Sequence, residues 1–324
     1  LLLGQALGDA IGFVVEAEPP DVAREYVKEW LRNGRAGERS HPQFPFGQYS
    51  DDTQLARDLV RSFAECGGWI PADYAMRLAE LFGQRRDVGA GPGTRSAAQR
   101  LLSGVPWQES GTAAPYAGNG SAMRAGPLGI LIPEPSAMCQ AAREQSRITH
   151  LDPRCAAGSI AVARAVALAT FPTIEPGPFL NDVSQCVASE DAMMALRIAD
   201  LTEWLSLDPV HAAEHVHRAG FDASQREGWQ GISAFVIPSV LWSLYAFLRS
   251  PDDYWETICT AVAVGGDTDT MAAISGAISG ARLGRVGLPS HLVERLNDRG
   301  DWNALALIDL AHRAASFINR PVGD

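Results

Sequence analysis

The sequence predicts an all-α fold, built as a single compact domain of many helices that covers residues 1–324. Apolar side chains recur at helical spacing along most of the 324 residues. Alternating runs of Val, Ile, Thr and aromatic residues long enough to form strands are absent. A chain of this length forms one large domain or two small ones. The Pro-rich segment 172–178 reads as a surface loop and could pass for a linker, but acidic clusters on both sides of it need to meet, which favours one domain.

Gly and Pro turns, such as Gly67-Gly68 and 89–93, separate the helical segments. The most apolar segment, 234–248, is shorter than the roughly 20 residues that span a bilayer, so it should be a buried helix and not a membrane anchor. Polar residues interrupt the apolar start before a signal-peptide core could form, and we expect residues to precede Leu1. In chain order, the predicted helices cover residues 2–16, 21–33, 51–66, 71–84, 93–103, 121–132, 136–148, 153–170, 189–205, 209–219, 233–249, 252–263, 268–283, 289–297 and 301–318.

Glycines recur every four positions in two of these helices. Because glycine has no side chain, it lets a neighbouring backbone approach closely. We therefore expect both helices to pack backbone to backbone against core neighbours, and the second to hold the acidic residues before it rigidly. The glycines are Gly4, Gly8 and Gly12 in the first helix, and Gly276, Gly280 and Gly284 in and after the second.

Two acidic clusters, at 50–53 and 265–270, lie far apart in the sequence, and each precedes a predicted helix. They offer carboxylates and hydroxyls but no His or Cys, a set that hard cations such as Mg²⁺ or Mn²⁺ prefer and zinc does not. If the fold brings the clusters together, they can hold one ion or a pair.

Each cluster could instead be an ordinary helix cap. Ser50 is a favourable N-cap residue, and Asp51 and Asp52 would complement the positive end of a helix dipole. Asp267 or Thr268 could cap the helix at 268–283. A cap needs only one acceptor, however, and adjacent carboxylates repel each other unless a cation lies between them. The surplus of carboxylates favours a metal site and predicts that the clusters meet in space.

Charge and cysteine content restrict the function further. The net charge is −11, from 27 basic and 38 acidic side chains, which disfavours nucleic acid or an anionic membrane as the main partner. The five cysteines are scattered and include no CxxC pair. This pattern indicates neither a zinc knuckle nor a disulfide framework and favours a cytoplasmic location.

A rival metal motif lies in the helix predicted at 209–219. His211, Glu214 and His215 match the HxxEH pattern of inverted zinc-peptidase helices, and the two histidines would share a helix face. A third ligand further along the chain is not evident. A charged, solvated helix face is therefore the favoured interpretation, with a zinc peptidase as the alternative.

Five motifs follow one another along the chain. They are Gly8-Asp9-Ala10-Ile11-Gly12 followed by Glu16, Ser50-Asp51-Asp52-Thr53, Gly118-Asn119-Gly120-Ser121-Ala122-Met123-Arg124, Thr149-His150, and Gly266-Asp267-Thr268-Asp269-Thr270. Each is weak alone, but together they resemble the ADP-ribosylglycohydrolase family over nearly the whole chain. The resemblance implies an all-α hydrolase with two Mg²⁺ or Mn²⁺ ions in a cleft. It would cleave the glycosidic bond between ADP-ribose and an acceptor, which is a protein side chain or a small molecule.

The resemblance also implies roles for particular residues. The metal ligands would be Ser50, Asp51, Asp52, Asp267, Asp269 and Thr270, with Ser50 in place of the threonine usual in the family. Glu16 corresponds to the family's glutamate near the scissile bond, and Glu16, Asp51 and Asp267 are the candidates for proton transfer. The candidate substrate contacts are Gly91, Gly118, Asn119, Gly120, Ser121, Met123 and His150.

Elementary chemistry agrees with a phosphate-binding loop at 118–121. A glycine-rich turn before a helix offers free N–H groups to an anion. The turn that begins at Gly91 has the same form, and a plain turn is equally open there. The side chains of Met123 and Arg124 are expected to pack and pair behind the loop. We expect Asn119→Ala to weaken ADP-ribose binding and to leave metal content unchanged.

The implied partner is an ADP-ribose-containing substrate, for which an ADP-ribosylated protein is one candidate. The linkage that is cleaved stays open at the level of sequence. The remaining alternative is a non-catalytic, ADP-ribose-binding or scaffold member of the family. The intact acidic clusters argue against it, because such a protein has no use for crowded carboxylates.

Overall fold

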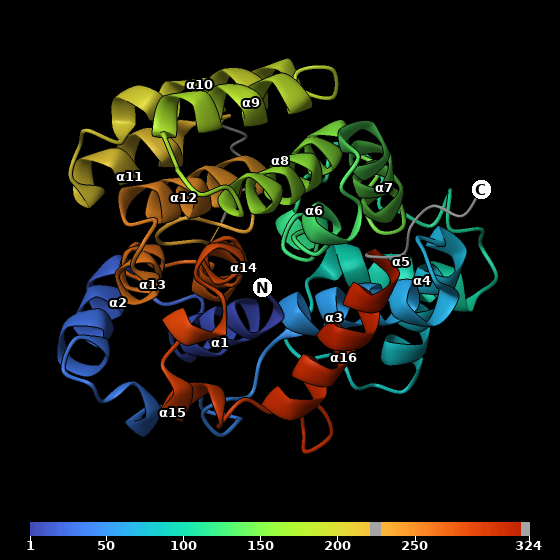
Figure 1. Ribbon diagram of the computed structural model, residues 1–324, viewed down its shortest axis with the longest axis horizontal. Helices are drawn as coiled ribbons and strands as arrows, with labels where there is room; N and C mark the ends of the chain where they lie inside the picture. Colours follow the sequence, from blue (N-terminus) through green and yellow to red (C-terminus); the bar gives the residue numbers. More distant parts are fainter. Residues whose placement is uncertain (221–227, 319–324) are drawn as a thin grey trace.

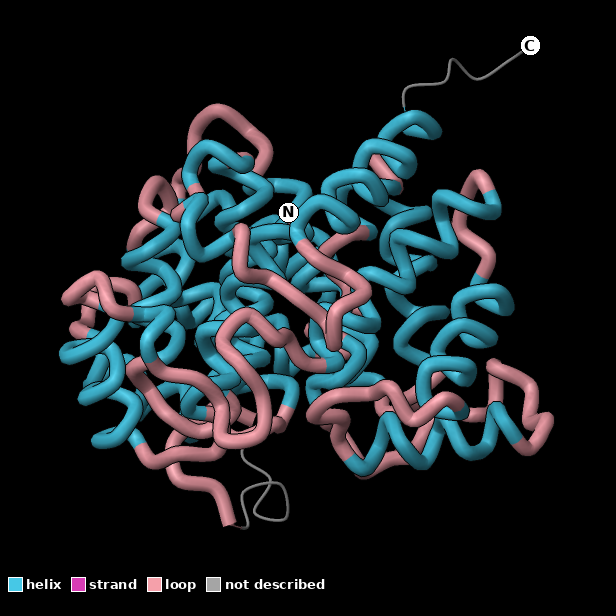
Figure 2. The backbone as a smooth tube through the Cα atoms, turned by 90° about the horizontal axis from the view of Figure 1, so that it is seen from below, coloured by secondary structure: helices cyan, strands magenta, loops and turns pink. Residues whose placement is uncertain are grey.

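The chain, described here by a computed structural model over residues 1–220 and 228–318, consists of helices joined by loops and contains no strand in these ranges (Figures 1 and 2). The all-α prediction is confirmed. The α-helices are α1 (Leu2–Gly12), α2 (Pro20–Tyr26), α3 (Asp51–Cys66), α4 (Pro71–Gly83), α5 (Pro92–Leu102), α6 (Leu128–Leu131), α7 (Pro135–Arg147), α8 (Pro153–Ala169), α9 (Pro176–Val187), α10 (Ala192–Trp204), α11 (Pro209–Arg218), α12 (Val236–Arg249), α13 (Tyr254–Val262), α14 (Thr268–Leu283), α15 (Ser290–Val293) and α16 (Ala304–Ile318). Shorter turns include η1 (Phe13–Val15), η3 (Ala36–Glu38), η4 (Asn119–Ser121) and η6 (Arg285–Gly287), and a π-helical turn η2 (Val27–Leu31) extends α2.

Two segments differ from the prediction. No helix was expected between 170 and 189, yet α9 begins at Pro176, where proline suits the first turn of a helix. Its buried Phe179, Leu180, Val183 and Val187 have helical spacing, so the signal was present in the sequence. Conversely, the helix predicted at 121–132 is only η4 and the short α6. Pro127 between them disfavours helical geometry at the residue before it.

Three predicted helices are also shorter than expected. The segment 2–16 is α-helical only to Gly12, and η1 follows it. The segment 289–297 is helical only at α15. At the other end of the chain, 301–318 starts its helix at Ala304.

Helices α1 and α14 pack antiparallel through glycine. A Cβ atom built on Gly4 would lie 2.4 Å from the carbonyl oxygen of Gly276, and one on Gly8 would lie 2.1 Å from that of Ala272. One on Gly12 would lie 2.3 Å from the carbonyl oxygen of Thr268, so the two backbones touch along the whole of α1. The close approach predicted from the glycine spacing is confirmed, except that Gly284 ends α14 and meets nothing within 4 Å.

Helix α3 begins on the side of α1. The buried carboxylate of Asp9 accepts hydrogen bonds from the Ser50 N–H (2.8 Å), the Thr53 N–H (3.1 Å) and the Thr53 hydroxyl (2.6 Å). The Gln5 amide donates to the carbonyl oxygens of Asp52 and Met123, at 3.0 Å each. Helix α1 therefore fixes the starts of α3 and α14, which carry the two acidic clusters.

Elements from both sides of 172–178 share the core. Helix α14 packs against α1, α3 and α8 as well as against α12 and α13, and Figure 1 shows it near the centre of the molecule. The single domain over 1–324 stays a prediction that these contacts support. The apolar α12 is buried from Val236 to Leu248 as expected. None of the described helices is both long and apolar enough to cross a bilayer.

Candidate metal and substrate site

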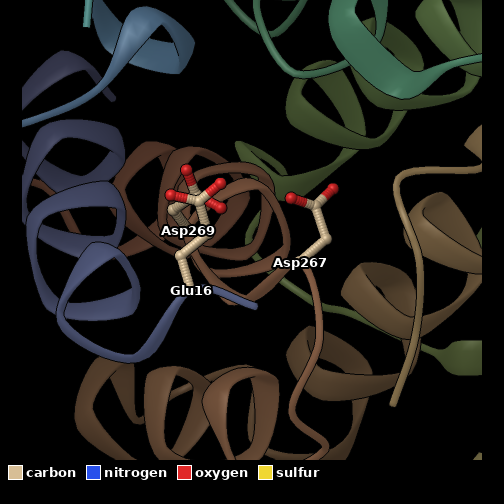
Figure 3. A group of neighbouring side chains, drawn as sticks. All are labelled: Glu16, Asp267 and Asp269. Atoms are coloured by element: carbon tan, nitrogen blue, oxygen red, sulfur yellow. The ribbon is translucent and has the colours of Figure 1, made fainter. Parts of the chain in front are cut away.

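Antiparallel packing of α1 on α14 brings three carboxyl groups together. Because the end of α1 lies beside the start of α14, Glu16 faces Asp267 and Asp269 (Figure 3). One oxygen from each carboxyl group lies within 4.8 Å of the others, a spacing at which all three could contact one cation. Glu16, predicted only as a proton-transfer residue, thus lies in the tightest acidic group of the described residues.

Glycines at positive φ hold the second cluster against two other loops. Gly265 (φ 70°) and Gly266 (φ 82°) adopt a backbone conformation that favours glycine. The Ala17 N–H donates to the Gly266 carbonyl oxygen (2.8 Å), and the Asp267 N–H donates to that of Ile232 (2.8 Å). A Cβ on Gly266 would lie 2.1 Å from the same Ile232 oxygen, so a larger residue would push these loops apart.

The first cluster combines a helix cap with surplus charge. Ser50 caps α3 by accepting from the Asp52 N–H (3.3 Å), and its hydroxyl donates to Asp52 Oδ2 (3.0 Å). Asp51 is anchored by its N–H, which donates to the Val88 carbonyl oxygen (2.7 Å). Both carboxylates are buried. Ser50 therefore caps α3. The carboxylates of Asp51 and Asp52 accept no hydrogen bond from the N–H groups of the first turn.

Electrostatics shows that the clusters face one region. Burial raises the pKa of Asp52 well above its usual range, and the nearby charges of Asp9, Asp51 and Asp267 raise it further. Burial likewise raises the pKa of Asp269, with contributions from Glu16 and Asp52. These residues act on one another across the two clusters, as the surplus of carboxylates predicted.

Unpartnered oxygens support a cation at this site. Asp52 Oδ1 and Asp269 Oδ1 are buried and have no hydrogen-bond partner. A buried, unpaired carboxylate oxygen is costly unless a donor or a metal meets it. Asp267, the expected cap of α14, makes no side-chain capping bond. The oxygen-only donor set suits a hard divalent cation, and the residues present fit such an ion.

Asn119 connects the predicted phosphate loop to the second cluster. Its Nδ2 donates to Asp267 Oδ2, and to the Ser239 hydroxyl at 2.9 Å. Its backbone N–H donates to the Ala234 carbonyl oxygen (2.9 Å), which attaches η4 to the start of α12. Asn119 is therefore an orienting partner of a candidate metal ligand, a role that only the tertiary structure reveals.

The same loop needs glycine because its neighbours lie close. It forms the 3-10 turn η4, in which the Ala122 N–H donates to the Asn119 carbonyl oxygen (2.8 Å). A Cβ on Gly120 would lie 2.9 Å from Thr94 Oγ1 and 3.1 Å from His150 Cε1, so the loop needs glycine there. Gly118 lies beside Tyr116 and His150 in the same way.

His150 is buried and neutral. Burial lowers its pKa to about 3, with a further contribution from Arg124. The Thr149 hydroxyl accepts from Arg124 Nη2 (2.8 Å) and lies within hydrogen-bond distance of His150 Nδ1 (2.8 Å). His150 Nε2 lies on the side of Gly118. Tyr116 stacks on the ring at 5.7 Å.

Arg124, Met123 and Gly91 occupy different positions around the loop. Arg124 is fully buried behind the loop, where Nε donates to Gln145 Oε1 (2.8 Å) and Nη1 to the Gly120 carbonyl oxygen (3.0 Å). Met123 is buried in the hydrophobic core, so its side chain packs behind the loop as expected. Gly91 is exposed at the start of α5. Its role in substrate binding stays a prediction.

The described residues offer the zinc-peptidase alternative no third ligand. His211 lies beside its helix cap Asp208, and His215 stacks on Trp204 with ring centroids 5.5 Å apart. The described residues contain only one group of metal-ligating side chains, that of Glu16, Asp267 and Asp269. The HxxEH pattern is a charged helix face.

Sequence reasoning missed two supporting residues. Asp9 was recognised only as part of a motif. Its role as the acceptor that orients the start of α3 is visible only in the contact between α1 and α3. Burial raises the pKa of Asp9 to about 6, against hydrogen bonds from Thr53 and Ser50 that lower it. Ser239 had no signal at all, because a lone serine in an apolar helix reads as a core residue.

Comparisons with known proteins agree with this geometry. A family model described as ADP-ribosylglycohydrolase matches residues 1–317. The chain belongs to the ADP-ribosylglycohydrolase family. The ADP-ribosylhydrolase ARH3 of Xenopus tropicalis is 28% identical over an alignment 330 residues long. The alignment covers 93% of this chain and 92% of that protein. The ADP-ribosyl-[dinitrogen reductase] glycohydrolase of Rhodospirillum rubrum is 27% identical over 301 residues, with 91% and 88% coverage. A solved structure titled ADP-ribosylglycohydrolase-related protein complex superposes with a TM-score of 0.64 at 25% identity, covering 98% of this chain and 95% of that one.

Membership in the ADP-ribosylglycohydrolase family defines the class of reaction. The chain is an enzyme that hydrolyses the glycosidic bond between ADP-ribose and an acceptor. The family is metal-dependent, and the buried acidic group supplies a candidate metal site. The scaffold alternative is therefore set aside, since family and site both indicate an enzyme.

Proposed function

We propose that this ADP-ribosylglycohydrolase holds two Mg²⁺ or Mn²⁺ ions between the acidic clusters. The ligands would be Ser50, Asp51, Asp52, Asp267, Asp269 and Thr270. The observation that carries the proposal is the pair of unpartnered, buried oxygens on Asp52 and Asp269, one from each cluster. Glu16 adds a third carboxyl group to the second cluster and is partly buried.

Bound divalent ions would supply Lewis-acid stabilisation of oxygen ligands and lower the pKa of water. The chain's own residues then have separate tasks. Asn119 and the loop at Gly265–Gly266 hold Asp267 in place. Asp9 holds the first turn of α3, so that Asp51 and Asp52 keep their positions.

We assign proton transfer to carboxyl groups of this site. Burial raises the pKa of Glu16 to about 8 in the metal-free protein, and the charges of Asp267 and Asp9 contribute. A carboxyl group of this kind can hold or accept a proton near neutral pH, which suits general acid–base catalysis of glycosidic cleavage. We propose Glu16, with Asp51 or Asp267 as its partner.

The ADP-ribosyl half of the substrate would lie against the glycine loop. The glycine-rich turn at 118–121 suits the diphosphate, and the neutral ring of His150, whose Nε2 lies on the side of Gly118, suits an oxygen of the same ligand. Gly91, Gly118 and Met123 complete the proposed binding region. Five free thiols, Cys66, Cys139, Cys155, Cys186 and Cys259, support the cytoplasmic location that we propose.

For the acceptor we propose an ADP-ribosylated protein. Support comes from the names of relatives of similar identity, which include the dinitrogen reductase glycohydrolase and the ADP-ribosylarginine hydrolase Tri1 of Pseudomonas putida, 27% identical over 310 residues. Nucleic acid remains a disfavoured partner because of the net charge of −11.

A substrate panel tests the proposal. Peptides ADP-ribosylated on arginine or on serine, together with small ADP-ribosyl conjugates, are incubated with the enzyme in Mg²⁺, in Mn²⁺ and in EDTA, and released ADP-ribose is measured. We expect release from at least one protein-type conjugate in either cation and none in EDTA. Metal analysis should find two ions per chain. Full activity in EDTA would refute the metal assignment, and release only from small conjugates would refute the acceptor.

A further inference from the structure

Asp298 is a buried aspartate that lies outside both acidic clusters, in the loop after α15. Its Oδ1 accepts hydrogen bonds from Gln48 Nε2 (3.1 Å) and Gln54 Nε2 (3.0 Å). Its Oδ2 accepts from Arg57 Nη1 (2.7 Å). The two glutamines and the arginine are buried as well. Both oxygens of this carboxylate therefore have protein donors, unlike the unpartnered oxygens of the acidic clusters, so Asp298 is not itself a candidate ligand.

Gln54 connects Asp298 to the backbone beside the first acidic cluster. It lies three residues after Asp51 on α3, where its Nε2 also donates to the Arg86 carbonyl oxygen (3.0 Å). Its Oε1 accepts from the Val88 N–H (3.1 Å). The Val88 carbonyl oxygen in turn accepts from the Asp51 N–H (2.7 Å). A reversed amide would place its NH₂ group against the Val88 N–H, so these partners fix the orientation of the side chain.

Gln48 makes a second connection, to the segment that leads into α3. Its Oε1 accepts from the Arg299 N–H (2.9 Å). The Asn297 N–H donates to the Gly47 carbonyl oxygen (2.9 Å). Backbone and side chain therefore both attach the segment before α3 to the loop after α15, which carries Asp298.

We propose that Asp298 is a positioning residue for the metal ligands of the first cluster and acts on Asp51 through Gln54. This inference rests on the proposed function, in which Asp51 binds a divalent cation. Asp9 holds the start of α3 from the side of α1, and Asp298 holds it from the side of the loop after α15. Only a carboxylate offers two acceptor oxygens to these three donors, because an asparagine in its place has one oxygen and an NH₂ group.

Calorimetric titration of Mg²⁺ into metal-free protein tests this role. In Asp298→Asn, we expect the affinity for Mg²⁺ to fall by about tenfold. That value is the lower end of the range for partners that orient metal ligands, because Asp298 acts through a second side chain. In hydrolysis assays, the Mg²⁺ concentration that gives half the maximal rate should rise by a similar factor. The kcat at saturating Mg²⁺ should stay near the wild-type value, because every proposed ligand is still present.

Gln54→Glu is a second variant that breaks the same link. Its carboxylate would face Asp298 Oδ1 and the Arg86 carbonyl oxygen, both of which now accept from Nε2. We expect the affinity for Mg²⁺ to fall here as well. The double variant should lose less affinity than the two single losses combined, because residues in direct contact are not additive. Full additivity would show that the two residues act separately and would contradict the proposed link.

Asp58→Asn is the matched control. Asp58 is likewise a buried aspartate and accepts from Arg57 Nε (3.1 Å) and Nη2 (3.2 Å), but the link from Asp298 to Asp51 does not pass through it. Its substitution should lower the melting temperature and leave the affinity for Mg²⁺ at the wild-type value.

Two kinds of failure are distinguishable in these titrations. Wild-type affinity in Asp298→Asn, or an equal loss of affinity in Asp58→Asn, would overturn this inference and leave the proposed function intact. Wild-type protein that binds no Mg²⁺ would overturn the proposed function and this inference with it.

Discussion

At the scale of single residues, the carboxylates of the acidic site repel one another unless a cation is bound between them. Asp52 and Asp269 each have a buried oxygen without a partner, and each has a pKa well above the usual range. Neutralising either one in the metal-free protein relieves repulsion, whereas the same change removes a charged ligand from the metal-bound protein. Stability and activity should therefore respond in opposite directions.

Asp52→Asn and Asp269→Asn test this directly. We expect hydrolysis of ADP-ribosylated substrate to fall by about 100-fold or more, because a ligand is lost at a site where even orienting partners contribute 10–100-fold. Helical content by circular dichroism should be unchanged, and the melting temperature in EDTA should be equal or higher. Asp309→Asn, which alters only an exposed ion pair with Arg313, is the control and should match wild type in all three. An Asp52 or Asp269 variant with wild-type activity would contradict the ligand assignment.

The structure changes what is expected of Asn119. From sequence, Asn119→Ala should weaken ADP-ribose binding alone. Because its amide holds Asp267, the substitution should also lower metal affinity, by roughly 10-fold to 100-fold as for other orienting partners of metal ligands. Calorimetric titration of Mg²⁺ into metal-free protein, followed by ADP-ribose at saturating Mg²⁺, measures both effects. Unchanged metal affinity with weakened ADP-ribose binding would restore the simpler, substrate-only role.

At the scale of elements, α1 organises the site although it carries none of the proposed metal ligands. Its Asp9 orients α3, and its glycine face lets α14 approach. Its end, through η1, positions Glu16. Stability and activity should therefore both depend on α1 packing.

Gly8→Ala tests the role of the helix contact. The added methyl group would lie 2.1 Å from the Ala272 carbonyl oxygen, so α1 and α14 must separate. We expect a loss of about 1–3 kcal/mol in the free energy of unfolding, the usual range for overpacking, together with reduced hydrolysis. Urea denaturation measures the first. Gly177→Ala on α9 is the control, since nothing lies within 4 Å of its Cβ position, and stability there should be preserved. Equal stability of the two variants would show that the helices can yield without cost.

At the scale of the whole molecule, the buried acids make stability depend on pH and metal together. Glu16 has a folded-state pKa of about 8, above its ordinary value of 4.5. A raised pKa means that the folded protein binds a proton that the unfolded chain has released. The corresponding stabilisation is complete at low pH and is lost as the pH rises toward 8. The contribution of His150 to the pH dependence of stability has the opposite sign, because its pKa is lowered to about 3. That contribution is confined to pH values below 6.5.

Thermal unfolding between pH 6.5 and 8, compared with and without the cation, tests the effect of the acids. In EDTA, we expect the melting temperature to fall as the pH rises through this window. With saturating Mg²⁺ the fall should be smaller or reversed, because the cation competes with protons for the same oxygens. Differential scanning fluorimetry at matched ionic strength measures both series. A melting temperature in EDTA that rises with pH would contradict the raised pKa values.

The sequence by itself determined most of the helical architecture and the chemistry of the donor groups. Helical spacing, caps and turn residues are local properties, so α3, α8 and α14 were predicted within a residue or two. The oxygen-only clusters also indicated a hard cation before any geometry was known. Where local cues conflicted, as in the Pro-rich segment that begins α9 or the glycine-rich segment before α6, the prediction was wrong.

Tertiary structure alone decided which residues act together. That Asp9 orients the first turn of α3, that Asn119 holds Asp267, and that Glu16 joins the second cluster all depend on contacts between residues far apart in the chain. The raised pKa values follow from burial, which a linear sequence does not specify. The physical reason is that helix formation depends on neighbours within a few residues. The metal site depends instead on how the backbones of α1 and α14 pack. Glycine in the sequence permits such a contact but does not specify which helix makes it.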